Sequence, residues 1–211
     1  INRKLEIFIK NINLPKYLQK NEIPVEKKIT IKKRIREIVS PPKEKFLTKS
    51  QEQYWNILGK NEITFCFGPS GTGKSFISMK KAISLLCDEN NKYEKILIVR
   101  PAVESGVSIG LLPGTIDNKI EQYIIPSYYL LNKIIGKQQT EIVKLEGIID
   151  TAAVSFLRGW NIDNTILLCE ESQNLTIMEL KLILTRIGFN SKFIISGDIE
   201  QSDKFKNKKD S

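Results

Sequence analysis

The chain of 211 residues contains no histidine, only three cysteines and no long apolar run. Without histidine it lacks imidazole metal ligands and the base that serine–histidine–aspartate and cysteine–histidine sites require. Acid–base chemistry must therefore come from carboxylates, lysine or bound water. No stretch approaches the roughly 18 apolar residues typical of a membrane-spanning helix, and no signal-peptide pattern opens the chain. We expect no membrane partner.

The three cysteines, Cys66, Cys87 and Cys169, are odd in number and far apart. This spacing favours neither a disulfide framework nor a zinc site. Cys66 and Cys169 fall inside expected strands, where we interpret them as small buried hydrophobic residues. The pattern predicts a reducing, cytoplasmic location.

Charge is distributed unevenly along the chain. The net charge is +9, and residues 1–50 hold 14 basic and 5 acidic residues, whereas the rest carries 19 of each. Pro41-Pro42 predicts a linker between a basic N-terminal appendage (1–42) and a main domain (43–211). The basic run 32–36 is either a nucleic-acid contact or a solvated helix face, and the sequence leaves both readings open. Because the chain begins at Ile1, we expect a piece of a longer protein.

From residue 50 onward, short apolar runs alternate with helical patterns. We expect strands at 63–67, 95–99, 148–154, 165–169 and 192–196. Continuous apolar runs of this length are typical of a parallel sheet that is buried on both faces. The alternation predicts an α/β domain of three layers, with helices on both faces of a mostly parallel sheet and the ligand at the carboxyl ends of the strands.

Helix signals fill the intervals between these strands. Thr176 and Glu179 have the spacing of a capping box, and we expect the helix that follows to end with Gly188 as its C-cap. A helical region over 115–135 is expected to be interrupted at Pro126. One apolar stripe is expected to pack the helix after residue 73 onto the core; it consists of Phe76, Met79, Ile83 and Leu86.

The most informative motif follows the first expected strand. Residues 68–75 match G-x-x-x-x-G-K-S/T, in which the backbone cradles phosphates at the start of a helix. Lys74 is expected to reach the β- and γ-phosphates, and the Ser75 hydroxyl is expected to bind Mg²⁺. The motif predicts binding of a nucleoside triphosphate by Gly68, Pro69, Ser70, Gly71, Thr72, Gly73, Lys74 and Ser75.

Two further elements complete the expected site. Glu170 and Glu171 end the apolar run 165–169. At this position, carboxylates can hold Mg²⁺ and orient the attacking water. We assign Glu170 to the Mg²⁺ shell and Glu171 to the polarisation of water. Gln201, in Gly-Asp-x-x-Gln after the last strand, is the candidate sensor of the γ-phosphate.

These elements together resemble the PhoH-like P-loop ATPases over about residues 50–203. The phosphate loop is common to many families, but the Arg-Pro-Ala-Val-Glu block at 100–104 and the Thr-Arg-Ile-Gly-Phe block at 185–189 are specific. The other matching blocks are Leu-Leu-Pro-Gly at 111–114, Phe-Leu-Arg-Gly at 156–159, Glu-Glu-Ser-Gln-Asn at 170–174 and Gly-Asp-Ile-Glu-Gln at 197–201.

The resemblance implies a RecA-like core related to superfamily 1 helicases, with ATP hydrolysis and ring-like homo-oligomers such as hexamers. It also implies an RNA or single-stranded DNA partner and a helicase-like or RNA-processing role. Gln51 matches a glutamine that is suited to read the adenine edge. Arg158 and Arg186 match family arginines, and either is a candidate γ-phosphate finger, in cis or from a neighbouring subunit.

Two departures from the family pattern leave alternatives open. The family usually has Asp-Glu where this chain has Glu170-Glu171, and it continues with a further strand beyond Ser211. The longer side chain at 170 puts the Mg²⁺ geometry and the hydrolysis rate in question. The alternatives are a nucleotide-dependent binding module with little turnover and, as a weaker option, a small-molecule kinase.

Overall fold

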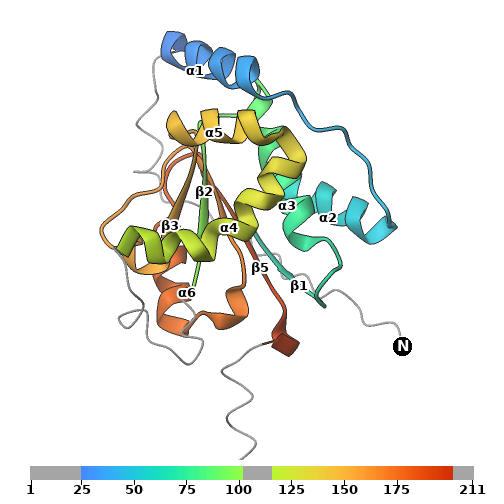
Figure 1. Cartoon of the computed structure of the whole chain (residues 1–211), viewed down its shortest axis with the longest axis vertical. Coiled ribbons are helices and arrows are strands. Elements are labelled where there is room, and N and C mark those ends of the chain that lie inside the picture. Colours follow the sequence, from blue (N-terminus) through green and yellow to red (C-terminus); the bar gives the residue numbers. More distant parts are fainter. Residues whose placement is uncertain (1–24, 102–115, 202–211) are drawn as a thin grey trace, which may run out of the picture.

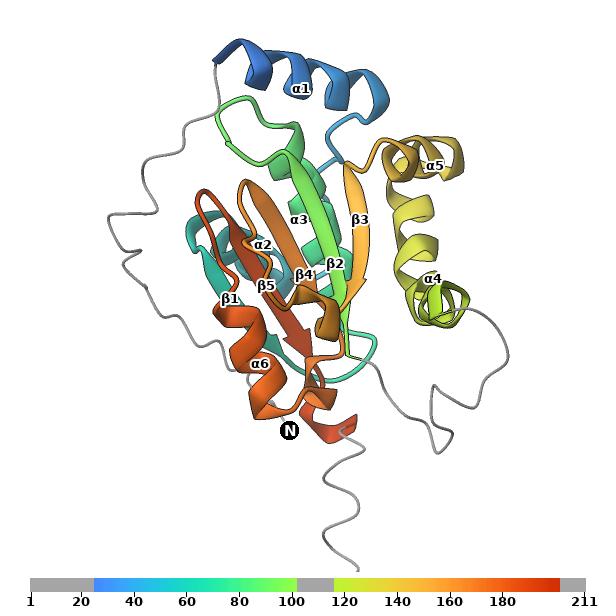
Figure 2. The same ribbon diagram turned by 90° about the vertical axis from the view of Figure 1, so that its left-hand side faces the viewer.

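The computed structural model describes residues 25–101 and 116–201. In this part of the chain one parallel sheet of five strands has the order β1-β5-β4-β2-β3 (Figure 2). Each strand agrees with its expected range within one residue at either end, which confirms the expected sheet. The strands are β1 (Ile63–Phe67), β2 (Lys95–Arg100), β3 (Ile149–Ala153), β4 (Thr165–Cys169) and β5 (Lys192–Gly197).

Helices cover both faces of this sheet, as expected for a RecA-like P-loop core. They are α1 (Val25–Ile38), α2 (Lys49–Lys60), α3 (Lys74–Cys87), α4 (Ile116–Ile135), α5 (Lys137–Leu145) and α6 (Ile177–Leu184). Figure 2 shows α6 on one side of the sheet and α3 on the other. Short 3₁₀ turns η3 (Val154–Leu157), η4 (Ser172–Asn174) and η5 (Ile199–Gln201) follow strand ends.

Alternate strand residues supply two separate cores. Ile96 and Ile98 face the larger core, which includes α3, whereas Leu97 and Val99 face the smaller core under α6 and η3. This alternation follows from the period of two along a strand. All three cysteines are buried and free, as we expected for Cys66 and Cys169.

The register brings three strand ends together at the carboxyl edge of the sheet. Phe67 at the end of β1 pairs with Gly197 on β5, and Ile195 of β5 pairs with Cys169 at the end of β4. The chain segments that leave β1, β5 and β4 therefore start side by side. These segments are the phosphate loop, the Gly-Asp-x-x-Gln element and the glutamate pair.

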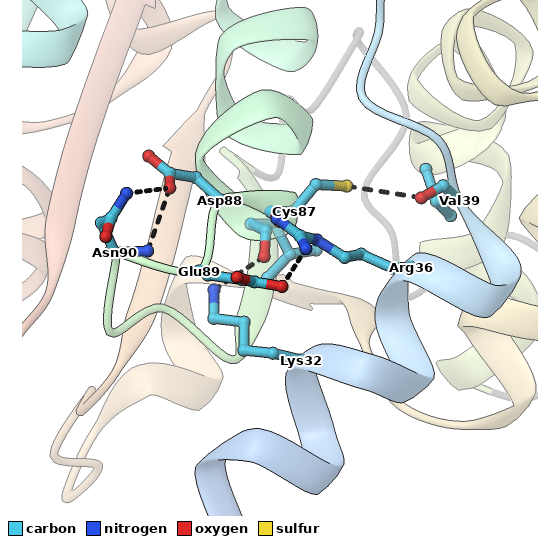
Figure 3. A network of polar contacts seen from close by, with 8 residues as sticks. Lys32, Arg36, Val39, Cys87, Asp88, Glu89 and Asn90 are labelled. Carbon is cyan, nitrogen blue, oxygen red and sulfur yellow. Dashed lines mark hydrogen bonds and ion pairs between the residues drawn. The ribbon is translucent and has the colours of Figure 1, made fainter.

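The basic run 32–36 has a role that neither sequence reading proposed. Lys32 is buried and its Nζ donates to the Leu86 carbonyl at 2.7 Å, while Arg36 Nε donates to the Cys87 carbonyl at 2.7 Å. Figure 3 shows both side chains reaching from α1 to the end of α3. Arg34 pairs with Glu146 after α5. The run therefore docks α1 onto the domain, beside the unpaired carbonyls that end a helix.

This docking places α1 far from the carboxyl edge of the sheet. Figure 1 shows α1 beside α5, at the end of the molecule where β2 and β3 begin. Ile35 and Val39 are buried in the larger core together with residues of α3. Residues 39–46, which include Pro41-Pro42, have no regular secondary structure.

Two expectations about where helices end or break were wrong. α6 ends at Leu184 with Thr185 as its C-cap, so Gly188 is not the cap. Gly188 instead donates to the Ile162 carbonyl at 3.0 Å, and a Cβ there would lie 2.1 Å from Asp163 Oδ1. α4 continues through Pro126, because a helix with buried residues such as Leu131 gains enough from packing to tolerate proline.

Phe76 was also misassigned to the core. Its neighbours in the stripe, Met79, Ile83 and Leu86, are buried, but Phe76 is 38% exposed and lines a cavity beside the phosphate loop. The capping box of Thr176 and Glu179 is confirmed. No helix in the described part of the chain is long and apolar enough to cross a membrane.

Candidate functional site

The phosphate loop joins β1 to α3, in the strand–loop–helix context that the motif predicts. Gly71 and Gly73 have positive φ angles of 76° and 87°, which only glycine adopts without strain. A Cβ at Gly73 would lie 2.9 Å from Nε2 of Gln51. The loop therefore needs glycine at this position for its backbone conformation and for the close approach of α2.

Lys74 closes this loop around its own side chain. Its Nζ donates to the carbonyls of Gly68 at 2.7 Å and Pro69 at 2.8 Å, and the Thr72 hydroxyl donates to Pro69 at 2.9 Å. The ammonium group thus lies inside the loop, at the start of α3. A cation and a helix N-terminus in one place attract an anion such as a phosphate.

A cavity of about 270 Å³ lies on one side of Lys74. It brings together residues that follow three strand ends and that span more than 120 positions of the sequence, from Ser70 to Gln201. Glu171, Asp198 and Gln201 line it opposite Ser70 and Ser75. Three predicted site residues therefore share one cavity: Glu171 for the polarisation of water, Gln201 for the γ-phosphate and Ser75 for Mg²⁺. Their roles remain predictions.

A second cavity, of about 490 Å³, lies on the other side of the phosphate loop. Gln51 lines it with Tyr54, Pro69, Thr72 and other residues. The Gln51 amide donates to the Thr72 carbonyl at 3.1 Å, and its oxygen accepts from the Leu47 backbone N–H at 2.9 Å. The two cavities meet at Gly71, Gly73 and Lys74, so phosphates on one side and a base on the other are sterically compatible.

The adjacent glutamates after β4 have different surroundings. Glu170 is 4% exposed; its Oε2 accepts from the Ser127 hydroxyl at 2.6 Å and lies 3.2 Å from Arg100 Nε. It does not line the cavity with Ser75, which places the predicted Mg²⁺ residue behind the site. Glu171 does line the cavity, and its side chain is about half exposed.

Glu171 also has a strained backbone. Its φ of 55° lies in the left-handed region, which costs a non-glycine residue on the order of 1–3 kcal/mol. The Gln173 amide donates to the Glu171 carboxylate at 2.7 Å, and the Gln173 oxygen accepts from the Asp198 N–H at 3.0 Å. Strain of this kind concentrates at functional sites, and here it turns the carboxylate toward the cavity.

The sequence analysis missed the roles of four residues around this acidic pair. Arg100 and Gln173 lie in quoted family blocks and Asp198 lies in Gly-Asp-x-x-Gln, so their positions at strand ends carried a signal. Ser127 had none, because it contacts Glu170 only through the packing of α4. The blocks at 102–104 and 111–114 lie outside the described residues.

The two candidate finger arginines do not line either cavity of their own chain. Arg158 is exposed after η3, beyond the edge strand β3, whereas the phosphate loop follows the opposite edge strand β1. Arg186 Nη1 donates to the Trp160 carbonyl at 3.2 Å. A finger role in cis therefore has no support from this geometry.

The donor set suits a hard cation held together with phosphates. Among the described residues no group of three or more histidine, cysteine or acidic side chains forms a preassembled metal site. Mg²⁺ does not require one, because it is commonly held by one or two protein oxygens, water and substrate phosphates. The Ser75 hydroxyl and the Glu171 carboxylate line one cavity and fit this pattern.

Comparisons with known proteins agree with this arrangement. Residues 44–211 match the family model described as PhoH-like protein. The chain is 39% identical over 156 residues to a PhoH-like protein of Bacillus subtilis, covering 74% of this chain and 48% of that protein. It is 38% identical to a Synechocystis PhoH-like protein and 31% identical to protein PhoH of Escherichia coli, with coverage of 74% of this chain and 47% and 44% of theirs.

The chain spans about half the length of the curated relatives it matches. The family match covers most of the chain and includes the phosphate loop, the acidic pair and the Gly-Asp-x-x-Gln element. The parallel sheet brings these three elements to the carboxyl ends of its strands. The chain belongs to the PhoH-like protein family.

Proposed function

We propose that this protein binds ATP with Mg²⁺ and hydrolyses the ATP. The observation that carries the proposal is the cavity that Lys74, Ser75 and Glu171 line together. Binding of a phosphate needs the loop and its cation, and hydrolysis needs a carboxylate that faces the same space. Glu171 meets the second requirement.

The residues of this chain divide the work between binding and proton transfer. Lys74 and the loop N–H groups bind the triphosphate, and the Ser75 hydroxyl would hold the metal. Glu171 orients the attacking water and accepts its proton, while Gln201 contacts the γ-phosphate. Glu170 would reach the water shell of the metal only after exchanging its partners Ser127 and Arg100. The metal supplies neutralisation of the phosphate charge when it is bound.

Gln51 supports ATP as the nucleotide. It lines the second cavity, and its amide group has the donor and the acceptor that an adenine edge requires. In the present arrangement both groups contact backbone atoms of Thr72 and Leu47. Base recognition therefore requires Gln51 to exchange these partners.

Coupling to RNA or single-stranded DNA is the finer part of the proposal. The net charge of +9 favours a polyanionic partner, and the resemblance of the motifs implies a helicase-like or RNA-processing role. Lys32, Arg34 and Arg36 contact the protein itself, so they are poor candidates for this contact. The three buried thiols favour a cytoplasmic location.

A ring of subunits would give the arginines a role. Arg158 follows the edge strand β3, and the phosphate loop follows the opposite edge strand β1. In a ring, the Arg158 side chain of one copy could therefore reach the phosphate loop of its neighbour. ATP turnover per subunit that rises with protein concentration would support this homo-oligomer. A monomer by light scattering with full activity would contradict it.

One observation favours a second candidate function. Because Glu170 is held by Arg100 and Ser127 and does not line the cavity, the acidic pair presents only the carboxylate of Glu171 to it. If hydrolysis needs both, the protein is a nucleotide-dependent binding module with little turnover.

The deciding experiment measures phosphate release from ATP with Mg²⁺, with and without single-stranded RNA or DNA. Lys74→Ala should lose ATP binding and turnover. Glu171→Gln should keep ATP binding and lower kcat about 10²- to 10⁴-fold, as loss of a general base does. Lys137→Ala, which removes an exposed lysine on α5, is the matched control and should leave both unchanged.

The outcomes separate the candidates. Turnover that rises with nucleic acid and is lost in Lys74→Ala supports the proposal. Tight ATP binding without turnover in any condition would identify the binding module. Phosphoryl transfer to a metabolite without free phosphate would identify a kinase and overturn both.

A further inference from the structure

The turn that follows β3 exposes two large aromatic side chains. Phe156 is 49% exposed and Trp160 is 45% exposed, and the exposed Arg158 lies between them in the sequence. We call residues 156–160 the aromatic turn. Such side chains are usually buried because each removes a large apolar area from water.

The aromatic turn is anchored rather than loose. Val154 and Leu157 of η3 are buried in the smaller core, against which α6 packs. The backbone N–H of Trp160 donates to the Leu157 carbonyl at 3.2 Å, and Arg186 Nη1 donates to the Trp160 carbonyl at 3.2 Å. The backbone under both rings is therefore fixed, which lowers the entropy lost when a ligand binds to them.

Two arginines lie at this turn. Arg158 is exposed within it, and Arg186 donates to the Trp160 carbonyl. The nearby carboxylates of Asp163 and Glu179 are held by backbone N–H groups. Asp163 accepts from the Phe189 N–H at 2.6 Å, and Glu179 accepts from the backbone N–H of Thr176 at 2.7 Å in the capping box.

The strand β3, which leads into the aromatic turn, ends on the side of the sheet where the carboxyl ends of the other strands lie. Ala153 at the end of β3 pairs with Arg100 at the end of β2, and Val99 of β2 pairs with Cys169, directly before Glu170. Figure 2 shows the ends of β3, β2 and β4 at one end of the sheet. The chain therefore enters the aromatic turn from the carboxyl end of β3 and continues to Trp160, whose carbonyl accepts from Arg186.

We propose that Phe156, Arg158 and Trp160 form a stacking platform for single-stranded nucleic acid. Unpaired bases stack on the two rings, and Arg158 contacts the phosphates between them. Stacking tolerates any base because every base has a π-face, and it excludes duplexes, whose bases already stack on each other. The inference rests on the proposed nucleic-acid coupling and locates it on the molecule.

Tryptophan fluorescence gives a direct test of this platform. The chain has two tryptophans, and Trp55 is buried at 2% exposure. A base that stacks on Trp160 should quench its emission, so oligo-rU and oligo-dT are titrated into the full chain. The Trp160→Phe variant should lose the quenching but bind labelled oligonucleotide within a few-fold of wild type, measured by anisotropy.

Variants then separate stacking from charge. The double variant Phe156→Ala/Trp160→Ala should bind either oligonucleotide at least about tenfold more weakly. Arg158→Ala should reduce the slope of log affinity against log salt by about 1. Tyr129→Ala is the matched control: Tyr129 is 61% exposed on α4, has Lys133 over its ring and should be replaceable without effect.

The outcomes distinguish nucleic-acid binding in general from binding at the aromatic turn. Comparison of oligo-rU with oligo-dT identifies the preferred strand. If wild type binds neither oligonucleotide, nucleic-acid coupling itself fails, while the ATPase test stands. If it binds one but Trp160 is not quenched and the double variant binds equally well, only the platform is overturned. A change in Trp160 emission that depends on protein concentration alone would identify a contact between copies, which is the arrangement that Arg158 as a finger in a ring requires, and would overturn the platform.

Discussion

At the residue scale, the carboxylates of Glu170 and Glu171 are adjacent in the sequence but differ in burial and in contact with the cavity. Glu170 is buried between Arg100 and Ser127, and Glu171 is turned toward the cavity by a left-handed backbone. A buried ion pair contributes little net stability, but removal of one partner leaves an uncompensated buried charge. Arg100 therefore matters to the fold as well as to the site.

Arg100→Ala should destabilise the protein by about 3–5 kcal/mol, since Glu170 then stays buried without its cation. The double variant Arg100→Ala/Glu170→Gln should recover much of that loss, because a neutral amide can still accept from Ser127. Urea unfolding followed by circular dichroism measures both. A single variant that is as stable as wild type would show that Glu170 does not depend on Arg100.

At the element scale, α1 is held by contacts that its charge pattern does not reveal. Lys32 and Arg36 reach the carbonyl groups at the end of α3, the helix that begins at the phosphate loop. Burial lowers the pKa of Lys32 to about 8. The sequence shows the charge of this basic run. Only packing determines that Lys32 makes a buried contact and Arg36 a partly buried one.

Arg36→Ala should lower the free energy of unfolding by about 1–2 kcal/mol, because it removes a hydrogen bond from a charged donor to the Cys87 carbonyl. Lys33→Ala is the matched control: Lys33 is exposed on the same helix, and its replacement should change stability by less than about 0.5 kcal/mol. Equal effects of the two substitutions in urea unfolding would contradict docking of α1 through Arg36.

Sequence patterns predicted most elements because each pattern has a local cause. Apolar runs predicted all five strands, and the capping box predicted the start of α6. The wrong expectations were those in which tertiary contacts outweigh local preference. Gly188 looked like a helix cap but is needed because Asp163 and Ile162 lie against it. Phe76 matched the period of a buried stripe but lines a cavity.

At the scale of the whole molecule, buried ionisable groups predict how stability depends on pH. Burial lowers the pKa of Lys192 to about 8, from an ordinary value near 10.5. The folded protein therefore binds fewer protons than the unfolded chain between pH 8 and 10.5, so this group's contribution to stability rises with pH. The thiols act in the opposite direction above pH 9, since burial raises the pKa of Cys66 and Cys87 to about 11.

Comparison with Lys192→Met isolates the lysine, because both proteins keep the cysteines. From pH 8 to 10 the free energy of unfolding of wild type, relative to Lys192→Met, should rise by at most about 1.4 kcal/mol per pH unit. Urea unfolding at several pH values measures this difference. If this difference in the free energy of unfolding stays constant or falls with pH, burial does not lower the pKa of Lys192.

The sequence by itself predicted the ligand class and determined the architecture, because a phosphate loop and short apolar runs act through local backbone geometry. It also identified Lys74, Ser75, Glu171 and Gln201, which do meet in one cavity. Only the tertiary structure decided that Ser127 and Arg100 hold Glu170, that neither Arg158 nor Arg186 lines the cavities of its own chain, and that the basic run docks α1. Those outcomes depend on strand order and on packing between distant segments, and no local pattern encodes either.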